Sequence, residues 1–154
     1  MMNAVLSESG LAARLKADTG LIPGAVEETV RLFGAVCLMP RYTESGARIG
    51  DVAIPPNSWV LFGVRPASRD AAVYPDPGRF DLARHPQRLV SFGGLPHFCL
   101  GVHLARAELA TSLELLLARL PGLRLRQGPM PARLAVLRGV QHLPVAFDDV
   151  LPRS

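Results

Sequence analysis

The feature that most constrains this chain is the segment 92–101, where a glycine-rich loop delivers a cysteine to the start of a long helix. The loop reads FGGLPHFCLG and carries the thiol of Cys99. Apolar residues then recur at helical spacing from residue 101 to residue 120. Because backbone N–H groups at the start of a helix favour a nearby negative charge, this placement suits a thiolate. The loop therefore predicts a cysteine held in a defined position, either to bind a metal or to cap a core helix.

Three interpretations of Cys99 follow from the residues alone. A thiolate in an apolar loop is a good ligand for heme iron, and Gly101 would let the backbone pass close to a flat macrocycle. A zinc site would use His97, Cys99 and His103, but no fourth ligand stands at a matching spacing. The third interpretation is a buried cysteine that packs at the start of a core helix, as we expect for Cys37.

Composition excludes several classes of protein. Hydrophobic residues make up 49% of the 154 residues and charged residues 19%, which is typical of a soluble globular protein. The net charge is +4, but the basic residues are scattered without a lysine-rich run, so we expect no nucleic-acid partner. Two cysteines, no signal-peptide pattern and no apolar run of about 20 residues predict a reducing, cytoplasmic location and no membrane span.

Hydrophobic patterning predicts an α+β fold that is mainly helical. We expect helices over 4–17, from Pro23 to about Phe33 and over 101–120. Ile49, Val52 and Ile54 are expected to form one strand, joined by a tight turn to a second strand over 59–62. Residues 65–98 predict a long irregular stretch, and the tail over 123–147 predicts short strands such as 134–137 and 143–147.

The cysteine loop resembles the heme-binding loop of the cytochrome P450 family. The matching residues are Phe92, Gly93, His97, Cys99, Leu100 and Gly101. The resemblance implies heme b (iron protoporphyrin IX) as cofactor, Cys99 as the proximal iron ligand, and contacts from His97 and Arg41 to the heme propionates. One position departs, since the family usually has glycine where this chain has Leu95. We expect that change to distort the loop and weaken heme binding.

Two further motifs match the same family. Glu28 and Arg31 lie one helical turn apart in a segment that resembles the helix before the family's sheet. The segment 74–81 resembles the family's second fingerprint, and its Arg79 would complete a buried Glu–Arg–Arg network. We predict that Glu28, Arg31 and Arg79 are structural rather than catalytic, because a buried network locks a long loop in register.

The resemblance, to the bacterial-type, soluble members of the family, runs from about residue 6 to residue 147. It predicts that residues 1–154 form a single partial domain like the C-terminal heme-binding region of the family, with a small antiparallel sheet. It implies a truncated heme-thiolate monooxygenase that uses O2 to oxidise a substrate. The family's central helix, with an acid and a threonine over the distal heme face, has no match in the chain. We therefore identify no catalytic residue and expect the isolated chain to be inactive. The alternative is an inactive remnant or a non-catalytic module that binds heme or a partner.

Partners follow from the same resemblance. A holo enzyme would receive electrons from a ferredoxin or a flavoprotein, and Arg84, Arg88 and Arg106 near the loop could meet an acidic partner. A complementary chain with the N-terminal half of the family's fold is a further expected partner, because the predicted sheet would expose an unpaired edge.

Overall fold

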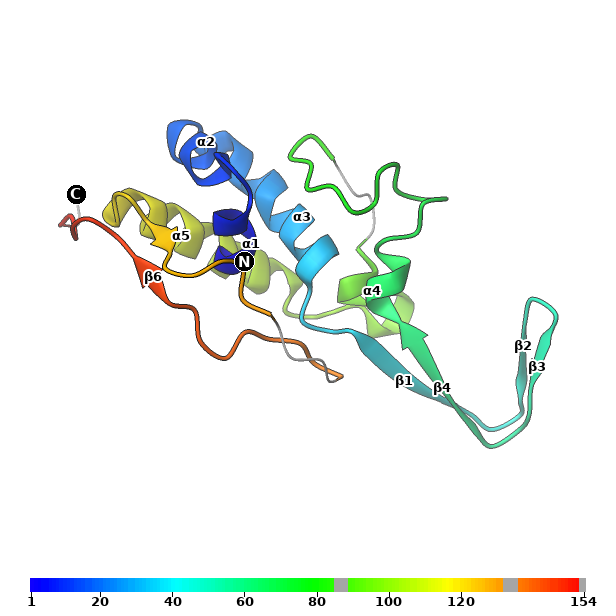
Figure 1. Ribbon diagram of the computed structural model, residues 1–154. Helices are drawn as coiled ribbons and strands as arrows, with labels where there is room; N and C mark the ends of the chain where they lie inside the picture. The colour runs from blue at the N-terminus through cyan, green and yellow to red at the C-terminus, as the bar shows by residue number, and fades with distance from the viewer. Residues whose placement is uncertain (85–88, 132–135, 153–154) are drawn as a thin grey trace.

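The computed structural model describes residues 1–84, 89–131 and 136–152. Figure 1 shows the longer helices gathered in one body, from which a slender arm of strands projects. The helices are α1 (Met2–Ser7), α2 (Leu11–Ala17), α3 (Ile22–Phe33), α4 (Val64–Ala67) and α5 (Val102–Arg119), with 3₁₀ turns η1 (Thr19–Leu21), η2 (Val90–Phe92) and η3 (Leu95–His97). The strands are β1 (Leu38–Thr43), β2 (Ala47–Ile49), β3 (Val52–Ile54), β4 (Ser58–Gly63), β5 (Arg124–Leu125) and β6 (Val145–Ala146).

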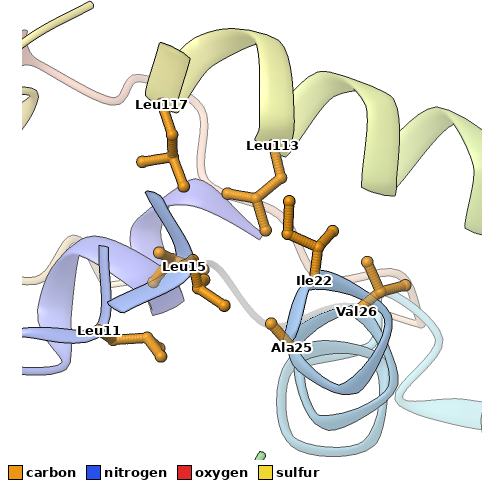
Figure 2. Packing of buried hydrophobic residues seen from close by; sticks show 8 residues of the cluster. Leu11, Leu15, Ile22, Ala25, Val26, Leu113 and Leu117 are labelled. Carbon is orange, nitrogen blue, oxygen red and sulfur yellow. The ribbon is translucent and has the colours of Figure 1, made fainter. Parts of the chain in front are cut away.

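The hydrophobic core joins α1, α2, α3 and α5 (Figure 2). It is built from aliphatic side chains: Val5, Leu11, Leu15, Ile22, Ala25, Val26, Leu113 and Leu117. The helix predicted after Pro23 is confirmed as α3, and that proline lies in its first turn, where no backbone N–H donor is needed. The predicted long helix is confirmed as α5, which packs across α3 and fixes where the chain leaves the cysteine loop.

The single helix predicted over 4–17 is wrong, because the segment forms two helices. Gly10 has a φ of 71°, which breaks the helical path between α1 and α2. Leu11 and Leu15 still share one buried face, as their spacing predicted. After this turn α2 packs on α5.

The arm of strands differs from the predicted hairpin. The chain reverses at 50–51, so Ile49 pairs with Val52 in the small ladder β2–β3 instead of continuing one strand. The predicted strand over 59–62 exists as β4, but its partner is β1. Tyr42 lies opposite Trp59 in that register, with their rings edge to face at 5.3 Å, and such a cross-strand pair favours this alignment.

The remaining segments largely follow the predictions. Within its described part, 65–98 holds only short helical turns among irregular chain. The tail forms β5 and β6, which pair with each other, so the described chain carries three separate two-stranded antiparallel ladders rather than one small sheet. The strand predicted over 134–137 lies partly outside the described residues, and its last residue Leu137 forms an isolated bridge with Val36. No helix among the described residues is long and apolar enough to cross a membrane.

Candidate functional site

The cysteine loop is closed by a backbone hydrogen bond across its length. The N–H of Cys99 donates to the carbonyl oxygen of Phe92 at 2.8 Å. The N–H of Val102 then donates to the carbonyl of Cys99 at 3.3 Å, which leads the chain directly into α5. Cys99 itself is exposed, whereas the other cysteine, Cys37, is buried as predicted. The loop therefore presents one thiol outward at the start of the longest helix.

Gly93 sets the shape of the loop. Its φ of 72° and ψ of −157° lie in a region that essentially only glycine occupies. A Cβ at this position would lie 2.7 Å from the carbonyl oxygen of His97, so the backbone approaches itself too closely for any side chain. Gly101 is different, since a Cβ there would meet no atom within 4 Å. The chain's own packing explains the glycine at 93 but not the glycine at 101.

The departure at Leu95 leaves the loop closed. Leu95 opens the 3₁₀ turn η3. The N–H of His97 donates to the carbonyl of Gly94 at 3.1 Å within that turn. The turn therefore forms with leucine at this position.

A side-chain anchor ties the loop to the helical body. Arg106 on α5 donates to both carboxylate oxygens of Glu27 on α3, at 2.6 and 3.0 Å. Its guanidinium carbon also lies 5.0 Å from the ring centroid of Phe92, within cation–π range. The hydrogen bonds to Glu27 raise the pKa of Arg106, with burial acting in the opposite direction. Phe92, which accepts the closing hydrogen bond, is thus held against both long helices.

The residues beside the thiol expose apolar surface. Phe98 is 52% exposed and Leu100 is 99% exposed, and His97 is exposed as well. An outward thiol flanked by apolar side chains and an imidazole suits a flat apolar group that carries a metal and carboxylates. Among the described residues, no three His, Cys, Asp or Glu side chains gather closely enough to hold a metal ion. The zinc interpretation therefore gains no support from the arrangement, while the donor set suits heme.

Arg41 lies on β1, apart from the loop in the chain. Its Nη1 donates to the carbonyl of Pro40 at 2.9 Å, and its Nη2 lies 3.0 Å from the Sδ of Met39. Both contacts stay within its own strand. The structure thus brings Phe92, Gly93, His97, Cys99 and Gly101 into one loop, and it gives Arg41 no carboxylate partner among the described residues.

The predicted Glu–Arg pair is fully buried in the C-terminal half of α3. Arg31 donates through Nε to Glu28 Oε1 at 2.6 Å and through Nη2 to Glu28 Oε2 at 2.8 Å. Arg31 also donates to three backbone carbonyls from the 65–84 segment, those of Ser68, Pro77 and Arg79. This pair therefore fastens the long irregular segment to α3, as a structural network would.

The third member of the network is not the guanidinium that the sequence indicated. The side chain of Arg79 is 65% exposed and pairs with Asp81 at 2.7 Å, and only its backbone carbonyl joins the network. Arg84 takes the place instead, with a side chain 11% exposed and its Nε 3.4 Å from Glu28 Oε2. Sequence reasoning missed this role because Arg79 lies in the fingerprint and Arg84 just after it, and spacing alone does not show which side chain turns inward.

Two of the three arginines predicted to meet an electron donor are already engaged inside the chain. Arg84 points to Glu28, and Arg106 is held by Glu27. Arg88 lies outside the described residues. Arg84 is only 11% exposed and so offers little surface to a partner, whereas Arg106 is 37% exposed.

Comparison with known proteins gives consistent results. A profile of the family described as Cytochrome P450 matches residues 16–131. Cytochrome P450 107B1 of Saccharopolyspora erythraea is 39% identical over 150 residues, covering 93% of this chain and 37% of that protein. The 6-deoxyerythronolide B hydroxylase of the same organism is 37% identical over 147 residues, covering 94% and 36%. This chain thus spans a little over a third of the length of these curated relatives.

Solved structures agree with the fold. Cytochrome P450 CYP109Q5 from Chondromyces apiculatus is 33% identical and superposes with a TM-score of 0.91 over 97% of this chain and 39% of its own. The cytochrome P450 enzyme CxnD for C–S bond formation in chuangxinmycin biosynthesis gives a TM-score of 0.93 at 34% identity, over 99% and 39%. The predicted fold, a mainly helical α+β part of that architecture, is confirmed.

Proposed function

The chain belongs to the cytochrome P450 family, whose cofactor is heme b, and we propose that Cys99 is the thiolate ligand of the heme iron in this chain. The observation that carries the proposal is the exposed thiol at the closed end of the 92–101 loop. A cysteine that merely capped a core helix would be buried, as Cys37 is. Gly101 supports the same conclusion, because the open space around it has no use within the described chain.

The chain's own residues would position and protect this ligand. Gly93 and the hydrogen bond from Cys99 to Phe92 fix the path of the loop, and Arg106 holds Phe92 against the body. The chain runs from Cys99 directly into α5, which begins at Val102, so the helix fixes where the sulfur is presented. Exposed apolar side chains at Phe98 and Leu100 would shield a bound heme from water.

His97 and Arg41 would hold the heme propionates. His97 is exposed in the same loop as the thiol, and Arg41 is a cation without a carboxylate partner among the described residues. A guanidinium binds a carboxylate through two parallel hydrogen bonds, which suits this role. Bound heme would supply the chemistry of oxygen activation, while these two residues would set its orientation.

For the protein to which this chain contributes we propose O2-dependent oxidation of a substrate. Relatives named as a hydroxylase and as steroid C26-monooxygenases carry out reactions of that class. A ferredoxin or a flavoprotein would deliver the electrons, and a complementary chain could supply the rest of the fold. A chain that binds heme but turns over no substrate would instead be the non-catalytic module, and a turnover assay separates these two functions.

The decisive experiment is the visible spectrum of the purified chain with added heme, recorded again after reduction under carbon monoxide. Thiolate ligation gives a strongly red-shifted Soret band in the reduced, carbon monoxide-treated sample. We expect this band in the parent and its complete loss in Cys99→Ala.

Cys37→Ala is the matched control, since it removes the other thiol while leaving the loop intact. It should keep the red-shifted band. A parent spectrum typical of free heme, or a band that persists in Cys99→Ala, would contradict the assignment of Cys99.

A further inference from the structure

Glu27 and Glu28 are neighbours on α3, but their carboxylates serve different parts of the chain. Successive residues of an α-helix project about 100° apart, so the two side chains leave the helix in different directions. Glu28 is fully buried and accepts hydrogen bonds from Arg31. The side chain of Glu27 is 22% exposed, and Arg106 of α5 donates to both of its oxygens. Glu27 therefore belongs to the side of α3 that meets α5.

The two hydrogen bonds to Glu27 fix the plane of the Arg106 guanidinium. Nε and Nη2 lie on one edge of this planar group, at 2.6 and 3.0 Å from the two carboxylate oxygens. A bidentate pair of this kind restrains orientation as well as distance. The guanidinium carbon lies 5.0 Å from the ring centroid of Phe92, the first residue of the cysteine loop. The carboxylate of Glu27 thus determines where this ring meets its cation.

The backbone of Phe92 carries this restraint to Cys99. Its carbonyl oxygen accepts the 2.8 Å hydrogen bond from the N–H of Cys99 that closes the loop. Glu27 and Arg106 contribute no atom to that hydrogen bond, and both lie outside the 92–101 segment. A Phe92 ring released from the guanidinium would leave the acceptor of the closing bond less firmly placed. The contacts therefore connect a carboxylate on α3 with the backbone that presents the thiol.

We propose that Glu27 is a positioning residue of the cysteine loop, which acts through Arg106. By holding the guanidinium against the Phe92 ring, Glu27 keeps the N–H of Cys99 bonded to the Phe92 carbonyl. The inference rests on the proposed function for its importance, since a thiol held in one place matters most where it binds iron. The restraint itself belongs to the chain without heme, and it is measured there.

The test is amide hydrogen exchange of the full chain without heme, followed residue by residue by NMR. A hydrogen-bonded N–H exchanges only when its region opens, so the Cys99 amide reports on the closing bond itself. Glu27→Gln keeps the size of the side chain and removes its charge. We expect the Cys99 amide to exchange about threefold to tenfold faster in this variant, the order expected for loss of a partly exposed ion pair and its cation–π contact. The amide of Leu117, in the core of α5, should change by less than about twofold.

A second background shows whether the effect passes through the ring. Phe92→Leu removes the aromatic face but keeps an apolar side chain, and it should speed exchange of the Cys99 amide by a similar factor. Adding Glu27→Gln to Phe92→Leu should then change the rate by less than about twofold, because the contact through which Glu27 acts is already gone. A Glu27 that only stabilised the packing of α3 on α5 would speed exchange equally in both backgrounds.

Conservative variants and a matched control complete the set. Glu27→Asp keeps the charge and Phe92→Tyr keeps the ring, so each should retain most of the protection of the Cys99 amide. Asp148→Asn is the matched control, because Asp148 also pairs with an arginine, Arg124, but beyond the C-terminal end of α5. It should leave exchange of the Cys99 amide within about twofold of the parent.

Unchanged exchange of the Cys99 amide in Glu27→Gln would overturn the proposal, as would an equal acceleration in the Phe92→Leu background. Arg106→Gln, with and without Phe92→Leu, is the same test one contact further along, so the proposal stays testable even if Glu27→Gln does not fold. Because exchange is measured without heme, failure of this proposal leaves the assignment of Cys99 as iron ligand intact. A Cys99→Ala chain that kept its heme band would likewise leave the exchange result unchanged.

Discussion

The network around Glu28 and the cysteine loop both lie beside α3, but they differ in whether their polar groups find partners inside the chain. Both carboxylate oxygens of Glu28 accept hydrogen bonds from Arg31, and Arg84 adds a third charge from the 65–84 segment. In the loop, the backbone is closed internally while the thiol of Cys99 and the side chain of Leu100 face outward. The carboxylate of Glu28, which is paired inside the chain, therefore has a structural role. The thiol of Cys99, which faces outward on a closed loop, is available to a ligand.

The largest effect on stability is expected from a substitution of Glu28, the buried carboxylate of the network. Glu28→Gln leaves the guanidinium of Arg31 buried without a counter-charge, so the free energy of unfolding should fall by about 3–5 kcal/mol. Urea denaturation followed by circular dichroism measures the loss. Arg79→Gln is the control, and it should cost less than about 0.5 kcal/mol because that side chain is mostly exposed. Similar losses in the two variants would mean that Arg79 belongs to the network after all.

These two regions also show what the sequence can and cannot predict. The pair Glu28–Arg31 and the order of loop residues ending in Cys99 are local patterns, so their positions followed from spacing on one helix and in one loop. The choice of Arg84 over Arg79 depends on how an irregular segment folds back on α3, which no local pattern encodes. The predicted strand pairing was wrong for the same reason, because β4 pairs with β1 and the β2–β3 hairpin lies between them in the chain.

The second prediction compares two glycines within the loop. Gly93→Ala should lower the free energy of unfolding by about 1–3 kcal/mol, because its backbone conformation is essentially restricted to glycine and its Cβ would meet the carbonyl of His97. Gly101→Ala should change stability by less than about 0.5 kcal/mol but should weaken heme uptake, because its Cβ would enter open space beside Cys99. Chemical denaturation and heme titration report the two effects separately. Unaltered heme uptake by Gly101→Ala would remove that residue from the heme site.

A third, smaller effect tests the anchor between the two regions. Arg106 and Glu27 are partly exposed, so the coupling from a double-mutant cycle with Arg106→Gln and Glu27→Gln should be about 0.5–1 kcal/mol. The more exposed pair between Arg124 and Asp148 is the matched control, and its coupling should lie near zero. If Arg106 also holds Phe92, Arg106→Gln should broaden the Soret band of the heme-loaded chain. Equal couplings for the two pairs would show that the contact with Glu27 does not fix the loop.

The smallest effect on stability is expected from a substitution of Asp81, which lies at the edge of the network. The hydrogen bond from the N–H of Ala83, followed by the hydrogen bond from Arg79, lowers the pKa of Asp81 below its usual value. A lowered pKa in the folded state stabilises the fold above the unfolded pKa of about 3.9, and this contribution is lost as pH falls through the folded pKa. Asp81→Asn should therefore make the free energy of unfolding fall less steeply below about pH 4 than in the parent. Arg79→Gln should change that slope less, because the Ala83 hydrogen bond is the larger cause. Acid denaturation curves of Asp81→Asn and the parent that ran parallel below pH 4 would show that the charge of Asp81 does not stabilise the fold. The network would then consist of Glu28 and its two arginines.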